Sequence, residues 1–203
     1  IPDPVKSTAP PPPPPPPPDN SPKTKPPGMV LHESGVMLLF DPVDEESITP
    51  IVTAILEANL EPEENRLEMM VLYIDSPGGD FSIGMKLVDI MKSSNIPIHT
   101  IATGKACSMG LVILMAGHLR AATENALLLS HQFTGGIAGK QDEMFSSVKG
   151  MEMLQETILN HYVKCTKKSR TWVKKNLLPL EEVYLTPEEA VTAGIIDEVL
   201  RIY

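Results

Sequence analysis

Apolar runs short enough to be strands alternate with helical patterns along most of this chain. The strand-like runs cover residues 36–40, 69–74, 98–103 and 126–130. Apolar residues at helical spacing occur between them, most clearly over 47–60, where Glu61 and Pro62 end the pattern. Strands joined by helices run parallel, and such a sheet is covered by helices. The alternation therefore predicts an α/β fold of repeated βαβ units around a mainly parallel sheet.

The first 28 residues are predicted to stay outside that fold. Residues 10–18 are nine consecutive prolines, and three more prolines follow by position 27. Such a run lacks amide donors and favours polyproline II, which extends by about 3.1 Å per residue. We expect a disordered proline-rich arm over 1–28, acting as a solvated tail or as a ligand for a proline-binding groove. Residues 29–203 are long enough for one domain with a sizeable core.

Composition limits the partners and the compartment. A formal net charge of −9 disfavours binding to nucleic acid. No apolar run approaches the ~20 residues of a membrane span and no secretory signal is visible, so we expect a cytoplasmic protein without a membrane partner. Cys107 and Cys165 lie far apart in the sequence, which fits a reducing compartment. The five histidines have no metal-ligand spacing, so neither a metal nor a cofactor is expected.

Ser108 lies in a segment of mostly small residues, 104–110, between the strand predicted at 98–103 and an apolar helix that begins near Leu111. The amides of a helix N-terminus have no partner within the helix. A serine at this junction has two interpretations. It can cap the helix with its side chain, or its hydroxyl can be exposed as a nucleophile on a tight strand-to-helix turn.

Other polar or flexible residues also follow predicted strands. His131 comes directly after the strand at 126–130, and Gly78 and Gly79 follow the strand at 69–74. Ligands and chemistry collect at the C-terminal ends of parallel strands, so these residues are expected near Ser108. His131 is then a candidate general base, and the amides of Gly79 and Met109 are candidate oxyanion donors. The alternatives are a structural histidine and an ordinary glycine turn.

A long helix is predicted over 141–164 from apolar residues that recur every three or four positions. At roughly 36 Å it is longer than the core needs, so it either projects to pair with another subunit or is an ordinary surface helix. Further on, Thr186, Pro187 and Glu189 form the pattern of a capping box, and Gly194 is expected to end that helix.

Four motifs together resemble the proteolytic subunit of the Clp protease. They are residues 73–79, 106–110, 130–136 and 186–197, in the family's order and close to its spacing. The resemblance covers about residues 36–200. It implies a ClpP/crotonase-like fold and a serine endopeptidase that hydrolyses unfolded proteins inside a chamber of heptameric, possibly stacked, rings. The 141–164 helix would be the projecting handle that joins rings, and a hexameric ATPase unfoldase is the implied partner.

The resemblance also implies roles for individual residues. Ser108 would be the nucleophile and His131 the general base of a catalytic triad. The family's third member, an aspartate, falls on Glu182 in this sequence. Gly79 and Met109 would form the oxyanion hole. The candidate substrate-binding residues are Gly78, Gly135 and Gly136.

Three alternatives remain open at this stage. A glutamate carries one more methylene than an aspartate, so Glu182 could be an exposed charge, and the chain a catalytically weakened or inactive ring subunit with a scaffold role. The short segment before Val36 and the short connection at 116–120 resemble Clp-like proteases of tailed phages, some of which mature the capsid. A crotonase-like acyl-CoA enzyme would share the fold, but would not be expected to carry both Ser108 and His131.

Overall fold

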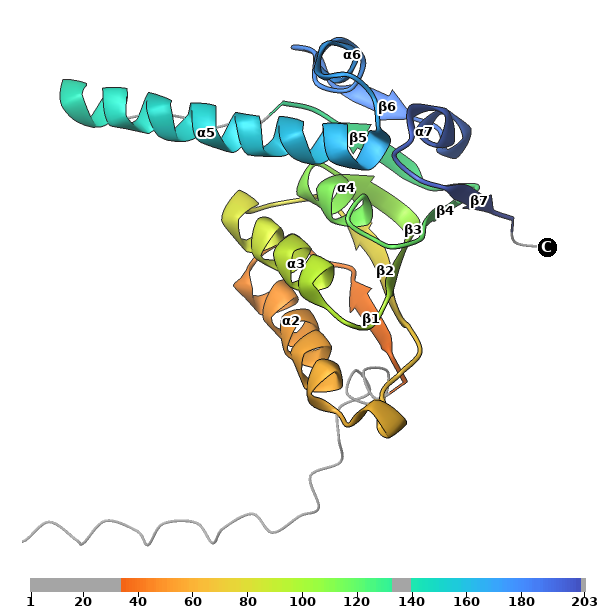
Figure 1. The fold of residues 1–203 in the computed structure, drawn as a ribbon. Coiled ribbons are helices and arrows are strands. Elements are labelled where there is room, and N and C mark those ends of the chain that lie inside the picture. Colours follow the sequence, from red (N-terminus) through yellow and green to blue (C-terminus); the bar gives the residue numbers. More distant parts are fainter. Residues whose placement is uncertain (1–33, 133–139, 202–203) are drawn as a thin grey trace, which may run out of the picture.

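The computed structural model describes residues 34–132 and 140–201 (Figure 1). The strands are β1 (Val36–Leu39), β2 (Met70–Ser76), β3 (Ile98–Cys107), β4 (Arg120–Thr123), β5 (Leu127–Ser130), β6 (Val183–Leu185) and β7 (Glu198–Leu200). The helices are α2 (Glu45–Leu60), α3 (Phe81–Ser93), α4 (Met109–Leu114), α5 (Gln141–Thr166), α6 (Arg170–Asn176) and α7 (Pro187–Ala193), with a 3-10 turn at Glu63–Asn65. The proline-rich arm predicted over 1–28 lies outside the described residues.

The strands form one mixed sheet in which most pairs are parallel. Its main path runs β1-β2-β3-β4-β7, all parallel, while β5 joins β3 and the antiparallel strand β6 joins β5. Helices α2, α3 and α4 lie side by side along the sheet, and α5 crosses over α4 (Figure 1). The predicted α/β fold with a mainly parallel sheet is confirmed. Strands β4, β6 and β7 have only three or four residues each, which is too short for the sequence to have indicated them.

Side-chain caps fix where several helices begin. Asp44 and Ser47 form a capping box at the start of α2, and the Asp80 carboxylate accepts from the Ile83 amide at the start of α3. The capping box predicted at Thr186 is present, and Gly194 ends α7 with a left-handed φ of 80°. These caps supply acceptors for amides that have no partner within the helix.

Strand β3 is longer than the sequence indicated, because it continues through Gly104 to Cys107. The register with β2 shifts here: Ile74 pairs with Ala102, but Ser76 pairs with Ala106. Between these pairs the Asp75 carboxylate accepts from the Lys105 amide at 3.1 Å. A Cβ at Gly104 would lie 2.7 Å from that carboxyl group, so the glycine permits this irregularity.

Helix α5 has 26 residues, about 39 Å of helix, and extends well past the sheet (Figure 1). Its C-terminal half packs on the core through Ile158, Leu159 and Tyr162, all less than a tenth exposed. The predicted projecting helix is therefore present. The buried half of α5 fixes its position against α4, the helix that follows Ser108.

His161 makes a polar contact between α5 and α4 inside this packing. Its side chain is buried, and Nε2 lies 2.9 Å from the main-chain oxygen of Val112. A carbonyl only accepts, so Nε2 carries the proton and Nδ1 accepts from the Lys92 ammonium at 3.0 Å. Burial first, and then the neighbouring Lys92 charge, lower the pKa of His161 from 6.5 to about 4.

The low pKa of His161 predicts a specific acid sensitivity. Between pH 6.5 and about 4 the unfolded histidine binds a proton that the folded one does not, so the free energy of unfolding falls as the pH is lowered through this window. His161→Gln should be less stable at pH 7 but lose less stability on acidification. Urea unfolding at pH 7 and pH 4.5 measures both effects.

Thr157→Val, on the exposed face of the same helix, provides the matched control, because it removes one side-chain hydrogen bond but no titratable group and should keep the pH dependence of the wild type. If His161→Gln loses as much stability on acidification as the wild type, the buried neutral histidine is not the cause.

Candidate active site

Ser108 occupies a sharp turn between β3 and α4. Its backbone has φ 53° and ψ −121°, a region that non-glycine residues rarely adopt and that costs on the order of 1–3 kcal/mol. Its amide donates to the Leu129 oxygen at 3.0 Å, which fixes the turn against β5. The side chain makes no capping hydrogen bond to α4, so the N-cap interpretation is wrong. A strained strand-to-helix turn instead exposes the hydroxyl, as in nucleophile elbows.

Strand β5 brings His131 to this turn. Leu129 pairs in parallel with Cys107, so the residues that follow each strand, Ser108 and His131, reach the same edge. Both line one cavity of about 60 Å³. His131 Nδ1 lies 2.5 Å from the main-chain oxygen of Gln132, and this contact requires the proton on Nδ1. Nε2 is then unprotonated, as a base accepting the proton of a serine hydroxyl requires.

The loop after β2 passes directly over Ser108. Gly78 has φ 92°, and a Cβ there would lie 2.7 Å from the Ser108 Cβ, so only glycine allows this approach. The loop is held on its other side by Val43, which donates to the Gly78 oxygen at 2.9 Å and accepts from the Asp80 amide at 2.8 Å. Gly79 lies between the two residues that Val43 binds, and it lines the Ser108 cavity.

Two main-chain amides at this cavity are available to a ligand. Within the described residues, neither the Gly79 amide nor the Met109 amide donates to an acceptor. Met109 is the first residue of α4 and is buried, and both residues line the cavity with Ser108. Amides fixed in this way can stabilise negative charge on a carbonyl oxygen attacked by the serine. The predicted set of Ser108, His131, Gly79 and Met109 therefore lies together, with Gly78 in contact.

The register of β6 with β5 places Glu182 near His131, but the Glu182 carboxylate bonds to another residue. Ser130 pairs with Val183 in the antiparallel β5–β6 ladder, so the next residues outward, His131 and Glu182, lie opposite each other. The Glu182 carboxylate accepts from the Tyr184 hydroxyl at 2.9 Å. Among the described residues no hydrogen bond joins Glu182 to His131. Its role as the orienting acid stays a prediction, while Gly135 and Gly136 lie outside the described residues.

Several residues that line the cavity were not identified from the sequence as site residues. They are Phe81, Val112, Gln132, Ile158 and Tyr162. Ile158 and Tyr162 lie four residues apart in the apolar stripe of α5, which indicated burial but not which cavity they would face. The Tyr162 hydroxyl lies 2.9 Å from the Ser130 Oγ, and burial raises the pKa of Tyr162 to about 12.

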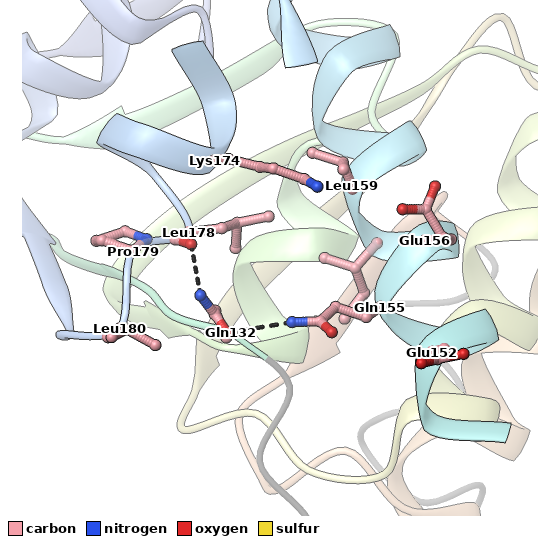
Figure 2. A pocket seen from close by; sticks show the side chains of 10 residues that line it. Gln132, Glu152, Gln155, Glu156, Leu159, Lys174, Leu178, Pro179 and Leu180 are labelled. Carbon is pink, nitrogen blue, oxygen red and sulfur yellow. Dashed lines mark hydrogen bonds between the residues drawn. The ribbon is translucent and has the colours of Figure 1, made fainter. Parts of the chain in front are cut away.

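A larger side cavity of about 510 Å³ adjoins the Ser108 cavity, and the two share Gln132 and Ile158 as lining residues. Figure 2 shows the Gln132 side chain between α5 and the segment that follows α6. Its Nε2 donates to the main-chain oxygen of Leu178 at 2.9 Å, and its Oε1 accepts from the side-chain Nε2 of Gln155 at 3.1 Å. The residue after His131 is thus held by its side chain from two directions.

Residues 34–132 and 140–201 contain no group of three or more His, Cys, Asp or Glu side chains that could hold a metal ion. In the same part of the chain, no helix combines the length and apolar character needed to cross a membrane.

Comparisons with known proteins show the family of this chain. The family model described as Clp protease matches residues 23–202. The ATP-dependent Clp protease proteolytic subunit of Deinococcus radiodurans is 32% identical over 168 residues, which cover 81% of this chain and 79% of that protein. With a family match over nearly the whole chain, this protein belongs to the Clp protease family.

Proposed function

We propose that this protein is a serine endopeptidase that hydrolyses peptide bonds of unfolded polypeptides. The observation that carries the proposal is the joint placement of Ser108 on its strained turn, the Nδ1-protonated His131 and two unpaired amides around one cavity. Acyl transfer by a serine needs these three elements together. Membership of the Clp protease family supports the same reaction class.

In the proposed reaction, Ser108 Oγ attacks the substrate carbonyl carbon while His131 Nε2 takes the hydroxyl proton. The carbonyl oxygen becomes negative and accepts hydrogen bonds from the amides of Gly79 and Met109. His131 then gives its proton to the departing amine, leaving an acyl ester on Ser108. Water, deprotonated by the same histidine, hydrolyses the ester and restores the enzyme.

The substrate backbone would run along the edge where Gly78 and Gly79 present main-chain atoms without side chains. Gly135 and Gly136 are also proposed to contact the substrate. A polypeptide has to be extended to reach a cavity of this size, so folded proteins would be excluded.

Assembly into rings is part of the same proposal. Helix α5 exposes apolar side chains, with Val148 45% and Met153 64% exposed, which is consistent with burial against another subunit. We propose heptameric rings, possibly stacked, with α5 as the handle between them. The name of the Deinococcus radiodurans relative includes ATP dependence, and a hexameric ATPase unfoldase is the corresponding candidate partner.

One observation favours a second candidate, a ring subunit with little or no activity. The Glu182 carboxylate bonds to Tyr184 rather than to the base. A histidine without a carboxylate partner stabilises the imidazolium of the transition state less well, and loss of the acid can lower turnover by about 10⁴. Such a subunit would still be expected to assemble, because Glu182 is not part of α5, the proposed handle.

Active-site labelling combined with mass in solution tests the proposal. A fluorophosphonate should react with the full-length protein at Ser108, and Ser108→Ala should lose both labelling and peptide hydrolysis, the latter by about 10³-fold or more. Ser93→Ala, a change at an exposed serine near the end of α3, serves as the matched control and should react like the wild type.

Peptide hydrolysis that persists in pure Ser108→Ala would exclude the proposed nucleophile. Rings of the expected mass that never react with the probe would favour the inactive subunit instead.

A further inference from the structure

The orientation of His131 depends on a main-chain oxygen. Its Nδ1 proton is donated to the carbonyl of Gln132, the next residue, and not to a carboxylate. A carbonyl can only accept, so this bond alone selects the tautomer that leaves Nε2 free for Ser108. A neutral oxygen provides that orientation while stabilising the imidazolium less than an ionised acid would. Whatever holds the Gln132 carbonyl in place therefore also holds the base.

The side-chain amide of Gln132 is held from two directions. The Leu178 oxygen can only accept, so Gln132 presents Nε2 to it at 2.9 Å and must present Oε1 to Gln155. Gln155 then donates through its own Nε2 at 3.1 Å, as Figure 2 shows. Leu178 is buried, so this anchor belongs to the packed part of the protein.

The residue on the other side of His131 is anchored in the same manner. Ser130 Oγ donates to the Leu177 oxygen at 2.5 Å, so the Tyr162 hydroxyl must be the donor in its 2.9 Å bond to Ser130. Ser130 and Gln132 thus bind consecutive carbonyls, those of Leu177 and Leu178. Each also binds one residue of α5, Tyr162 or Gln155, so His131 is held between two parallel sets of contacts.

We propose that Gln132 and Gln155 are positioning residues for the proposed base, and that the Gln155–Gln132–Leu178 contacts orient His131 in place of a triad carboxylate. The proposal rests on the proposed serine peptidase function. Within the described residues Gln155 bonds to Gln132 and makes no hydrogen bond to Ser108 or His131, so it would act through Gln132. If Gln155 no longer donates, the Oε1 atom of Gln132 loses this hydrogen bond. The main-chain carbonyl of Gln132, which accepts from His131, can then rotate.

Substitutions at Gln155 test this directly in the full-length protein. Gln155→Met keeps the length of the side chain but removes the donor, whereas Gln155→Lys keeps a donor. Loss of one hydrogen bond predicts that kcat for a peptide falls by about five- to tenfold in Gln155→Met, with KM changed by less than about twofold. Gln155→Lys should recover most of that loss.

The matched control is Glu152→Met, which places the same side chain in the same helix and the same side cavity, at a residue that makes no hydrogen bond to Gln132 within the described residues. It should not lower kcat. Glu182→Gln is measured in parallel, and the proposal expects it to lower kcat by less than Gln155→Met does.

A readout that needs no turnover separates this proposal from the proposed function. Nitrogen-15 spectra of the imidazoles should give a protonated Nδ1 for His131 in the wild type, and a mixture of tautomers in Gln155→Met only. If the tautomer shifts in this way but the wild type never reacts with a fluorophosphonate, the proposed function fails and the positioning role stands.

Two results would overturn the positioning role. One is a Gln155→Met variant with the kcat and the His131 tautomer of the wild type. The other is a loss in Glu182→Gln that exceeds the loss in Gln155→Met, because the carboxylate would then orient the base.

Discussion

Strand β3 pairs with two different strands along a single edge, and the site depends on that arrangement. Its first half pairs with β4, where Ala102 lies opposite Ala122, and its last residues pair with β5, where Lys105 lies opposite Leu127. The chain turns between β4 and β5 while β3 continues. Because β3 has this extra length, it ends at the same edge of the sheet as β5. Ser108 and His131, the residues that follow the two strands, therefore lie side by side. If β3 ended at Thr103, the residue that follows it would not lie beside His131.

The loop of Gly78 and Gly79, which passes over Ser108, also constrains the geometry of the candidate site. Val43 binds the loop on both sides of Gly79, so the position of the Gly79 amide is set by the segments that follow β1 and β2 rather than by α4, whose first residue supplies the other amide. The two amides around the cavity therefore come from independent parts of the fold. For the proposed reaction such a site is preorganised, because neither donor would have to move when charge develops on a substrate oxygen.

The sequence allowed the fold class and most of the site to be predicted, because these depend on local patterns. Alternating strands and helices indicated the parallel sheet, and strand ends indicated Ser108, His131 and Gly79. The length of β3 could not be predicted, since Gly104 and Lys105 resemble a loop and depend on Asp75 for their conformation. The partner of His131 could not be predicted either. It is the main-chain oxygen of Gln132, a residue whose side chain bonds to Gln155, 23 positions away with no distinguishing pattern around it.

The most direct test of the account is a crystal structure of the protein after reaction with a peptide aldehyde. We expect a hemiacetal on Ser108 Oγ, with its oxygen about 3 Å from the amide nitrogens of both Gly79 and Met109. His131 should keep its Nδ1 contact with Gln132 while Nε2 faces Ser108. An adduct on the neighbouring Cys107, or a hemiacetal oxygen directed away from both amides, would contradict the assignment of this cavity as the catalytic site.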